Sequence, residues 1–188
     1  MQEKVRKLIH ILDKEIDAYS KLKDLFEEKR ELLKKAKSDD LGVVDNKILA
    51  TNNTIVKLNA TRQTLSVELL GKDGSMSDFI SFVEANMPEQ KEALMLRKVK
   101  ICNIFEQLAL LNNQNMELIK HGIVITNKML ETIVSAFAPQ GSIYNGAGKT
   151  TETHDLNMWT INEEIWKGSF CLFKKTELLF YTMRYING

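Results

Sequence analysis

Residues that interrupt helices are scarce in this sequence. The 188 residues include only two prolines, Pro88 and Pro139, and glycine is sparse before Gly141. A proline in the interior of a helix costs about 3 kcal/mol relative to alanine, so its scarcity permits long helices. The composition therefore allows helices of several tens of residues through most of the chain.

An excess of charge of one sign and clustered metal ligands are also missing. Lys and Arg number 26 against 25 Asp and Glu, which leaves a net charge of +1. This balance argues against a nucleic-acid binder and against electrostatic docking to an anionic membrane. Neither Cys102 nor Cys171 lies in a CxxC motif, and the three histidines lack further ligands at metal-binding spacing. We predict no metal site and interpret Cys102, in an apolar run, as a small buried residue.

Long apolar runs are absent as well. No stretch approaches the roughly 18 apolar residues that a membrane-spanning helix needs. The N-terminus opens on the charged sequence MQEKVRK, and no apolar segment of a signal peptide follows it. These features predict a cytoplasmic protein that does not insert into a membrane.

Apolar residues instead recur in steps of three and four, which is the spacing of helices with one apolar face. We expect long helices over residues 3–37, 41–69 and 88–137, and a short connecting helix over 77–86. Ser38 or Asp39 is expected to cap the second helix, whose heptad is typical of a coiled coil. The predicted fold class is all-α, with long antiparallel helices that form an elongated hairpin or bundle of coiled-coil character.

Three polar residues lie on the predicted apolar faces. Arg62 interrupts the heptad of the second helix. One interpretation is that its side chain snorkels to solvent or pairs with a glutamate of the facing helix. The other is that it sets the register of the two helices. Asn112 and Asn115 lie on the core stripe of the third long helix. A polar residue at such a position costs stability but can fix register and partner. Each Asn either bridges within the bundle or donates to the backbone of a bound partner.

Signatures of catalysis are weak. The segment Gly146-Ala-Gly-Lys-Thr150 looks like the end of a P-loop, but the first glycine of that motif is replaced by Ile143. His121 lacks the flanking residues of a phosphotransfer domain, and no nucleophile with a base is suggested. We predict a protein that is not an enzyme and needs no cofactor; an undetected enzyme is a distant alternative.

Composition divides the chain into three parts. Residues 1–137 form the predicted helical domain, and residues 138–153 are small and polar, as in a linker. Residues 154–188 hold both tryptophans and half of all the aromatic residues. A tail this apolar is not expected to stay solvated by itself.

Two stretches resemble a known family. The sequence Leu110-Leu-Asn-Asn-Gln-Asn-Met-Glu-Leu118-Ile119 resembles the last-helix pattern of the FlgN family of flagellar type III export chaperones. The later stretch Ser142-Ile-Tyr-Asn-Gly-Ala-Gly148 is similar to the short Tyr-and-Gly motif of that family. The resemblance covers about residues 1–150, and the aromatic tail has no counterpart in the pattern.

The resemblance implies a cytoplasmic chaperone that binds C-terminal helical segments of hook–filament junction proteins and delivers them to the export gate. By motif match, Tyr144 is the residue implicated in docking to the cytoplasmic domain of the gate. The alternative is a structural coiled-coil scaffold that associates only with itself. We expect the client to bind the apolar end of the last long helix, at Leu118, Ile119, Ile123, Met129, Leu130, Ile133 and Phe137.

The tail has two interpretations. It folds back on this apolar surface, in the same chain or a neighbouring one, as an internal mimic of the client. Alternatively, it is a divergent extension that merely causes association.

Overall fold

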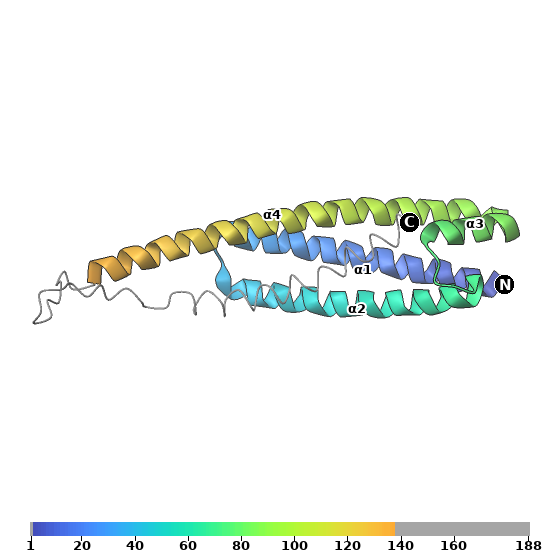
Figure 1. Ribbon diagram of the computed structural model, residues 1–188, viewed down its shortest axis with the longest axis horizontal. Coiled ribbons are helices and arrows are strands. Elements are labelled where there is room, and N and C mark those ends of the chain that lie inside the picture. Colours follow the sequence, from blue (N-terminus) through green and yellow to red (C-terminus); the bar gives the residue numbers. More distant parts are fainter. Residues whose placement is uncertain (1, 138–188) are drawn as a thin grey trace, which may run out of the picture. The chain divides into compact units, whose positions relative to one another are not determined.

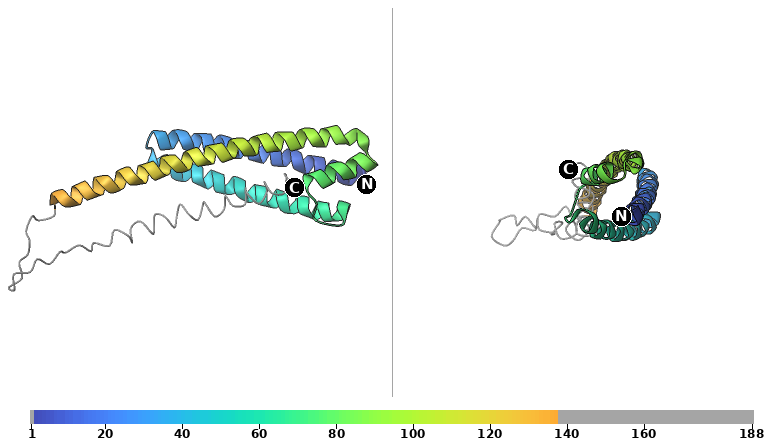
Figure 2. Two further views of the ribbon diagram at one scale, coloured as in Figure 1. Left: turned by 45° about the horizontal axis from the view of Figure 1, so that its top comes forward. Right: turned by 90° about the vertical axis from the view of Figure 1, so that its right-hand side faces the viewer.

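The computed structural model describes residues 2–137, and the regular secondary structure in this range is entirely helical. The helices are α1 (Gln2–Lys34), α2 (Ser38–Leu70), α3 (Met76–Asn86), the short 3-10 helix η1 (Pro88–Gln90) and α4 (Lys91–Phe137) (Figure 1). The two views of Figure 2 show α1 beside α2 and beside the first part of α4. The predicted all-α fold with long packed helices is confirmed.

A turn of three residues joins α1 to α2. Ala36 has a positive φ of 51°, and the Lys37 N–H donates to the Leu32 carbonyl at 3.1 Å. Such bonds satisfy carbonyl groups that the end of a helix leaves without a partner. The prediction that Ser38 or Asp39 caps α2 is wrong, because Lys37 is the N-cap residue and makes no side-chain cap.

The connection from α2 to α3 is fixed by glycine and serine. Gly71 ends α2 in the left-handed region, at a backbone φ of 71° that residues with a side chain rarely adopt. The Gly74 N–H donates to Ser66 Oγ at 2.8 Å, so the loop is tied back to the last turns of α2. Ser75 and Asp78 then form a capping box, in which each side chain accepts a bond from the other residue's N–H.

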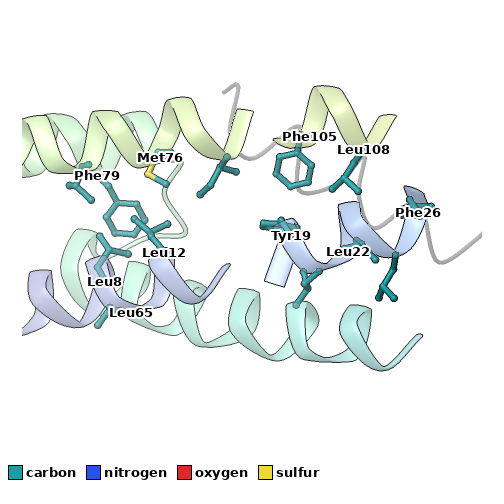
Figure 3. Packing of buried hydrophobic residues seen from close by; sticks show 14 of the residues in the cluster. Leu8, Leu12, Tyr19, Leu22, Phe26, Leu65, Met76, Phe79, Phe105 and Leu108 are labelled. Carbon is teal, nitrogen blue, oxygen red and sulfur yellow. The ribbon is translucent and has the colours of Figure 1, made fainter. Parts of the chain in front are cut away.

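The core of residues 2–120 forms where apolar faces of the helices meet. Tyr19 of α1 and Phe105 of α4 contact each other with ring centroids 4.6 Å apart and planes tilted by 55°. Arg97 of α4 donates to both carboxylate oxygens of Asp13 on α1, at 2.8 and 2.9 Å, which holds these two helices side by side. Figure 3 shows the packed side chains, which include Leu8, Leu12, Leu22, Phe26, Leu65, Met76, Phe79 and Leu108.

The described residues belong to two compact units, residues 2–120 and residues 121–137, and α4 contributes to both. The first unit contains α1, α2, α3 and η1 together with the α4 residues up to Lys120. The second is described by the α4 residues from His121 onward. The predicted linker and tail, residues 138–188, lie outside the described residues.

Candidate functional site

The last turns of α4 carry large apolar side chains in contact with solvent. We define the α4 apolar face as Ile123, Met129, Leu130, Ile133 and Val134. Met129 is 63% exposed and Ile133 is 52% exposed, whereas core residues of the first unit are almost fully covered. At 100° per residue these five positions fall within an arc of about 140° on the helix. An apolar stripe of this width is typical of a helix that packs against a partner, and the exposed Val124 and Ile125 lie outside it.

The hydroxyl side chains of this segment bond to their own helix. The hydroxyls of Thr126 and Thr132 donate to the carbonyls of Gly122 and Lys128, at 2.9 and 2.8 Å, and Ser135 donates to Thr132 O at 2.9 Å. These bonds use the hydroxyl hydrogens locally, so the hydroxyls have no donor left for another molecule. A partner that covers the α4 apolar face therefore needs no hydrogen bond to these three hydroxyls.

The predicted client-binding residues differ in their surroundings. Leu118 and Ile119 are half-buried and belong to the first unit, and Ile123 is half-buried in the second. Leu130, like Met129 and Ile133, is exposed. For Phe137 the structure describes the backbone, as the last residue of α4.

Val134 was missed by the sequence interpretation. It is 48% exposed and follows Leu130 by four residues, so the two side chains lie on neighbouring turns of the same face. The signal was present in the sequence, because the step of four is the helical repeat used to select the other residues. Val134 therefore extends the predicted surface without changing its position.

A buried ion pair joins α1 to α2. Arg62 Nε donates to Glu15 Oε1 at 2.9 Å, and the two side chains are 5% and 3% exposed. A second guanidinium nitrogen, Nη2, donates to Asn59 Oδ1 at 3.1 Å. This contact is the pairing with a glutamate of the facing helix that one of the two sequence interpretations of Arg62 expects. Because both residues are buried in the hairpin, we expect the pair to favour one register over others.

The Glu15 carboxyl is sensitive to this environment. Burial raises its pKa above the ordinary value of 4.5, and the charge and hydrogen bond of Arg62 partly oppose that rise. Burial penalises a charged carboxylate because the apolar interior solvates it poorly. Removal of Arg62 is therefore expected to raise the Glu15 pKa further.

The two predicted core asparagines are also distinguished by the structure. Asn115 is 2% exposed, and its Nδ2 donates to the Phe26 carbonyl at 3.0 Å. Within the described part of the chain its Oδ1 is buried and has no hydrogen-bond partner. Asn112 is only half-buried. Asn115 thus bridges α4 to α1 through its amide nitrogen, as one of the two sequence interpretations expects.

Residues 2–137 carry no cluster of metal ligands. In this range no group of three or more His, Cys, Asp or Glu side chains is placed to hold a metal ion. Cys102 is half-buried rather than fully buried. None of the described helices is long and apolar enough to cross a membrane. Tyr144 and the P-loop-like segment lie outside the described residues.

Comparisons with known proteins give one match. The family model described as FlgN protein matches residues 1–152, which is most of the chain. No curated protein and no solved structure matches. The match includes the whole described helical region and the Tyr-and-Gly motif, and it ends before the aromatic tail. The chain therefore belongs to the FlgN family of flagellar export chaperones.

Proposed function

We propose that the protein is a cytoplasmic chaperone that binds the C-terminal helical segments of hook–filament junction proteins and delivers them to the type III export gate. The observation that carries the proposal is the exposed α4 apolar face in a chain of the FlgN family. A helical client covers such a face with its own apolar residues, which removes both surfaces from water. Bound in this way, the client segment is withheld from assembly until export.

The alternative, a scaffold that associates through the heptad of α2, fits the packing less well. The heptad residues Val44, Ile48 and Ile55 are buried in the core of this same chain. A second copy would reach them only if the bundle opened. The client interaction needs no such opening, because Leu130 and Ile133 are already exposed.

Isothermal titration calorimetry with a C-terminal helical peptide of a junction protein tests the proposal. Leu130→Ala combined with Ile133→Ala should weaken peptide binding by about tenfold or more. The reason is that a large apolar side chain buried in an interface contributes about 1.5–3 kcal/mol, and 1.4 kcal/mol corresponds to a factor of ten.

The matched control is Val99→Ala combined with Leu110→Ala. These residues are on α4, are 54% and 59% exposed, and belong to the first unit. The control should bind the peptide as the unaltered protein does, and circular dichroism should show unchanged helicity in both variants. Equal affinity in both variants would remove the α4 apolar face from consideration. Light scattering that shows an obligate oligomer without a peptide complex would favour the scaffold.

A further inference from the structure

We propose that the chain regulates its own client site, because residues 154–188 dock on the α4 apolar face of the same molecule. A client must then displace this tail before it binds. The competition rests on the proposed chaperone function, whereas docking of the tail does not. The proposed occupant is residues 154–188 of this chain, and the surface that it covers is the α4 apolar face, in the second described unit.

The surface needs a cover that the described residues do not provide. From Lys128 to Ser135 every side chain is exposed, including those of Met129, Leu130 and Ile133. Soluble proteins rarely leave contiguous apolar surface of this kind open to water unless something binds there. The hydroxyls of Thr126 and Thr132 are bonded to their own helix, so an apolar occupant leaves none of these groups without a hydrogen bond.

The tail has the sequence of such a cover. Its apolar residues Met158, Ile161 and Ile165 follow steps of three and four up to Gly168, and Trp159 and Trp166 flank them. That spacing is typical of a helix with one apolar face. The segment 154–167 would be about 21 Å long as a helix, against about 26 Å for residues 121–137. The two lengths are thus well matched for an antiparallel pair.

The tail also lies outside the part of the chain that the family model matches. The family match ends at residue 152, so the apolar segment begins where the family pattern stops. Residues 138–153 connect this segment to the α4 apolar face. As a random coil a linker of this length spans on the order of 20 Å. This exceeds the separation of about 8–10 Å between packed helices, so the chain can reverse direction.

Charge does not oppose the contact. Residues 154–188 contain four acidic and four basic side chains, so the tail has no net charge at neutral pH with His154 neutral. The described unit 121–137 contains Lys128 and Glu131 on its length, which also balance each other. Apolar contact therefore determines whether the two segments associate, and a linker of this kind gives an effective concentration of about millimolar.

Both tryptophans of the chain, Trp159 and Trp166, lie in the tail, so the full-length protein reports on docking by its own fluorescence. The unaltered protein should show emission at short wavelength and weak quenching by acrylamide, and neither should change on dilution. Leu130→Ala with Ile133→Ala should shift the emission to longer wavelength and increase quenching, while Val99→Ala with Leu110→Ala should change neither. If the emission wavelength and the quenching of Leu130→Ala with Ile133→Ala equal those of the unaltered protein, the docking is overturned. Emission that shifts on dilution shows that the tail binds a neighbouring molecule, which overturns docking in the same one.

Competition is tested with a junction-protein peptide that lacks tryptophan. Adding the peptide to the full-length protein should shift the emission to longer wavelength as the tail is displaced. The tail variant Ile161→Ala with Ile165→Ala keeps both tryptophans and should bind the peptide about tenfold more tightly, since docking of the tail is weakened. Unchanged peptide affinity in this variant overturns the competition. A peptide that binds neither protein refutes the proposed function and leaves the fluorescence test of docking intact.

Discussion

Arg62 of α2 and Glu15 of α1 form a hydrogen-bonded ion pair of 2.9 Å inside the helical hairpin. Both side chains are almost fully buried, so water screens the pair very little. Each residue lies at a position that neighbouring heptad residues fill with apolar groups. A shift of one helix along the other would separate the charges and leave the Glu15 carboxylate buried without its partner, while Asn59 would stay beside Arg62 on α2.

Arg62→Met should therefore destabilise the protein strongly. The variant keeps the side-chain volume but leaves the Glu15 carboxylate buried without its partner, at an expected cost of about 3–5 kcal/mol in the free energy of unfolding. Urea denaturation followed by circular dichroism measures this change. Arg97→Met is the control, because Asp13 is 48% exposed and water can replace its partner. The control should cost about 1 kcal/mol or less.

The double variant Glu15→Leu with Arg62→Met separates stability from register. Apolar residues of similar volume often replace a buried ion pair with little loss of stability or with a gain. We expect the double variant to recover most of the stability that Arg62→Met loses. If the pair fixes the register, light scattering of the double variant should also show mixed oligomers. If the loss of stability in the double variant equals the sum of the losses in Glu15→Leu and Arg62→Met, the two residues act independently.

The stability should depend on pH through Glu15. Because burial raises the pKa of this carboxyl in the folded state above 4.5, the folded protein holds the proton more tightly than the unfolded chain. The resulting contribution to stability is complete below pH 4.5 and is lost as the pH rises through the folded pKa. Carboxyls whose pKa is lowered, such as Asp78, act in the opposite sense, so the comparison must isolate Glu15.

Urea denaturation of the unaltered protein and of Glu15→Gln at a series of pH values provides that comparison. The difference in the free energy of unfolding, unaltered protein minus variant, should fall as the pH rises from about 4 to 7. Other titrating groups are common to both proteins and cancel. A difference that grows with pH would mean that the attraction of Arg62 outweighs burial and that the Glu15 pKa is lowered.

Most of the fold could be predicted because its signals are local. The turn residues Gly71 and Gly74 and the proline Pro88 mark the connections on either side of α3, and the structure places the helix ends within a few residues of the prediction. The N-cap of α2 was missed because it depends on the geometry of the preceding turn. In that turn Ala36 adopts a positive φ and Lys37 takes the cap position.

Glu15 could have been found by its spacing alone. Leu12, Glu15 and Tyr19 follow steps of three and four, but the neighbouring Ile16 is apolar and fits the same spacing from Leu12, so the pattern favours Ile16 for the buried face. The structure leaves Ile16 half-buried and buries Glu15. Its pairing with Arg62, 47 residues away, depends on the register of the hairpin. A sequence pattern identifies the two faces, but it does not fix how far one helix is shifted along the other.

The role of Tyr144, which lies outside the described residues, is a prediction from the family motif. The family match reaches residue 152 and therefore includes this tyrosine, which the resemblance associates with docking to the export gate. An aromatic side chain on a surface loop is a suitable anchor, because burying its ring in a pocket of the partner contributes much of the binding energy. Tyr144→Ala should therefore weaken binding to the cytoplasmic domain of the gate by about tenfold or more.

Surface plasmon resonance against the isolated cytoplasmic domain of the gate measures this loss, and calorimetry with the junction-protein peptide measures client binding in the same variant. Client binding should stay unchanged, since Tyr144 is outside the α4 apolar face. Tyr144→Phe is the matched control: it keeps the ring and should retain most of the gate affinity if ring burial provides the anchor. Loss of client binding with normal gate binding would show that Tyr144 serves the client surface instead, and that the role carried over from the motif is wrong.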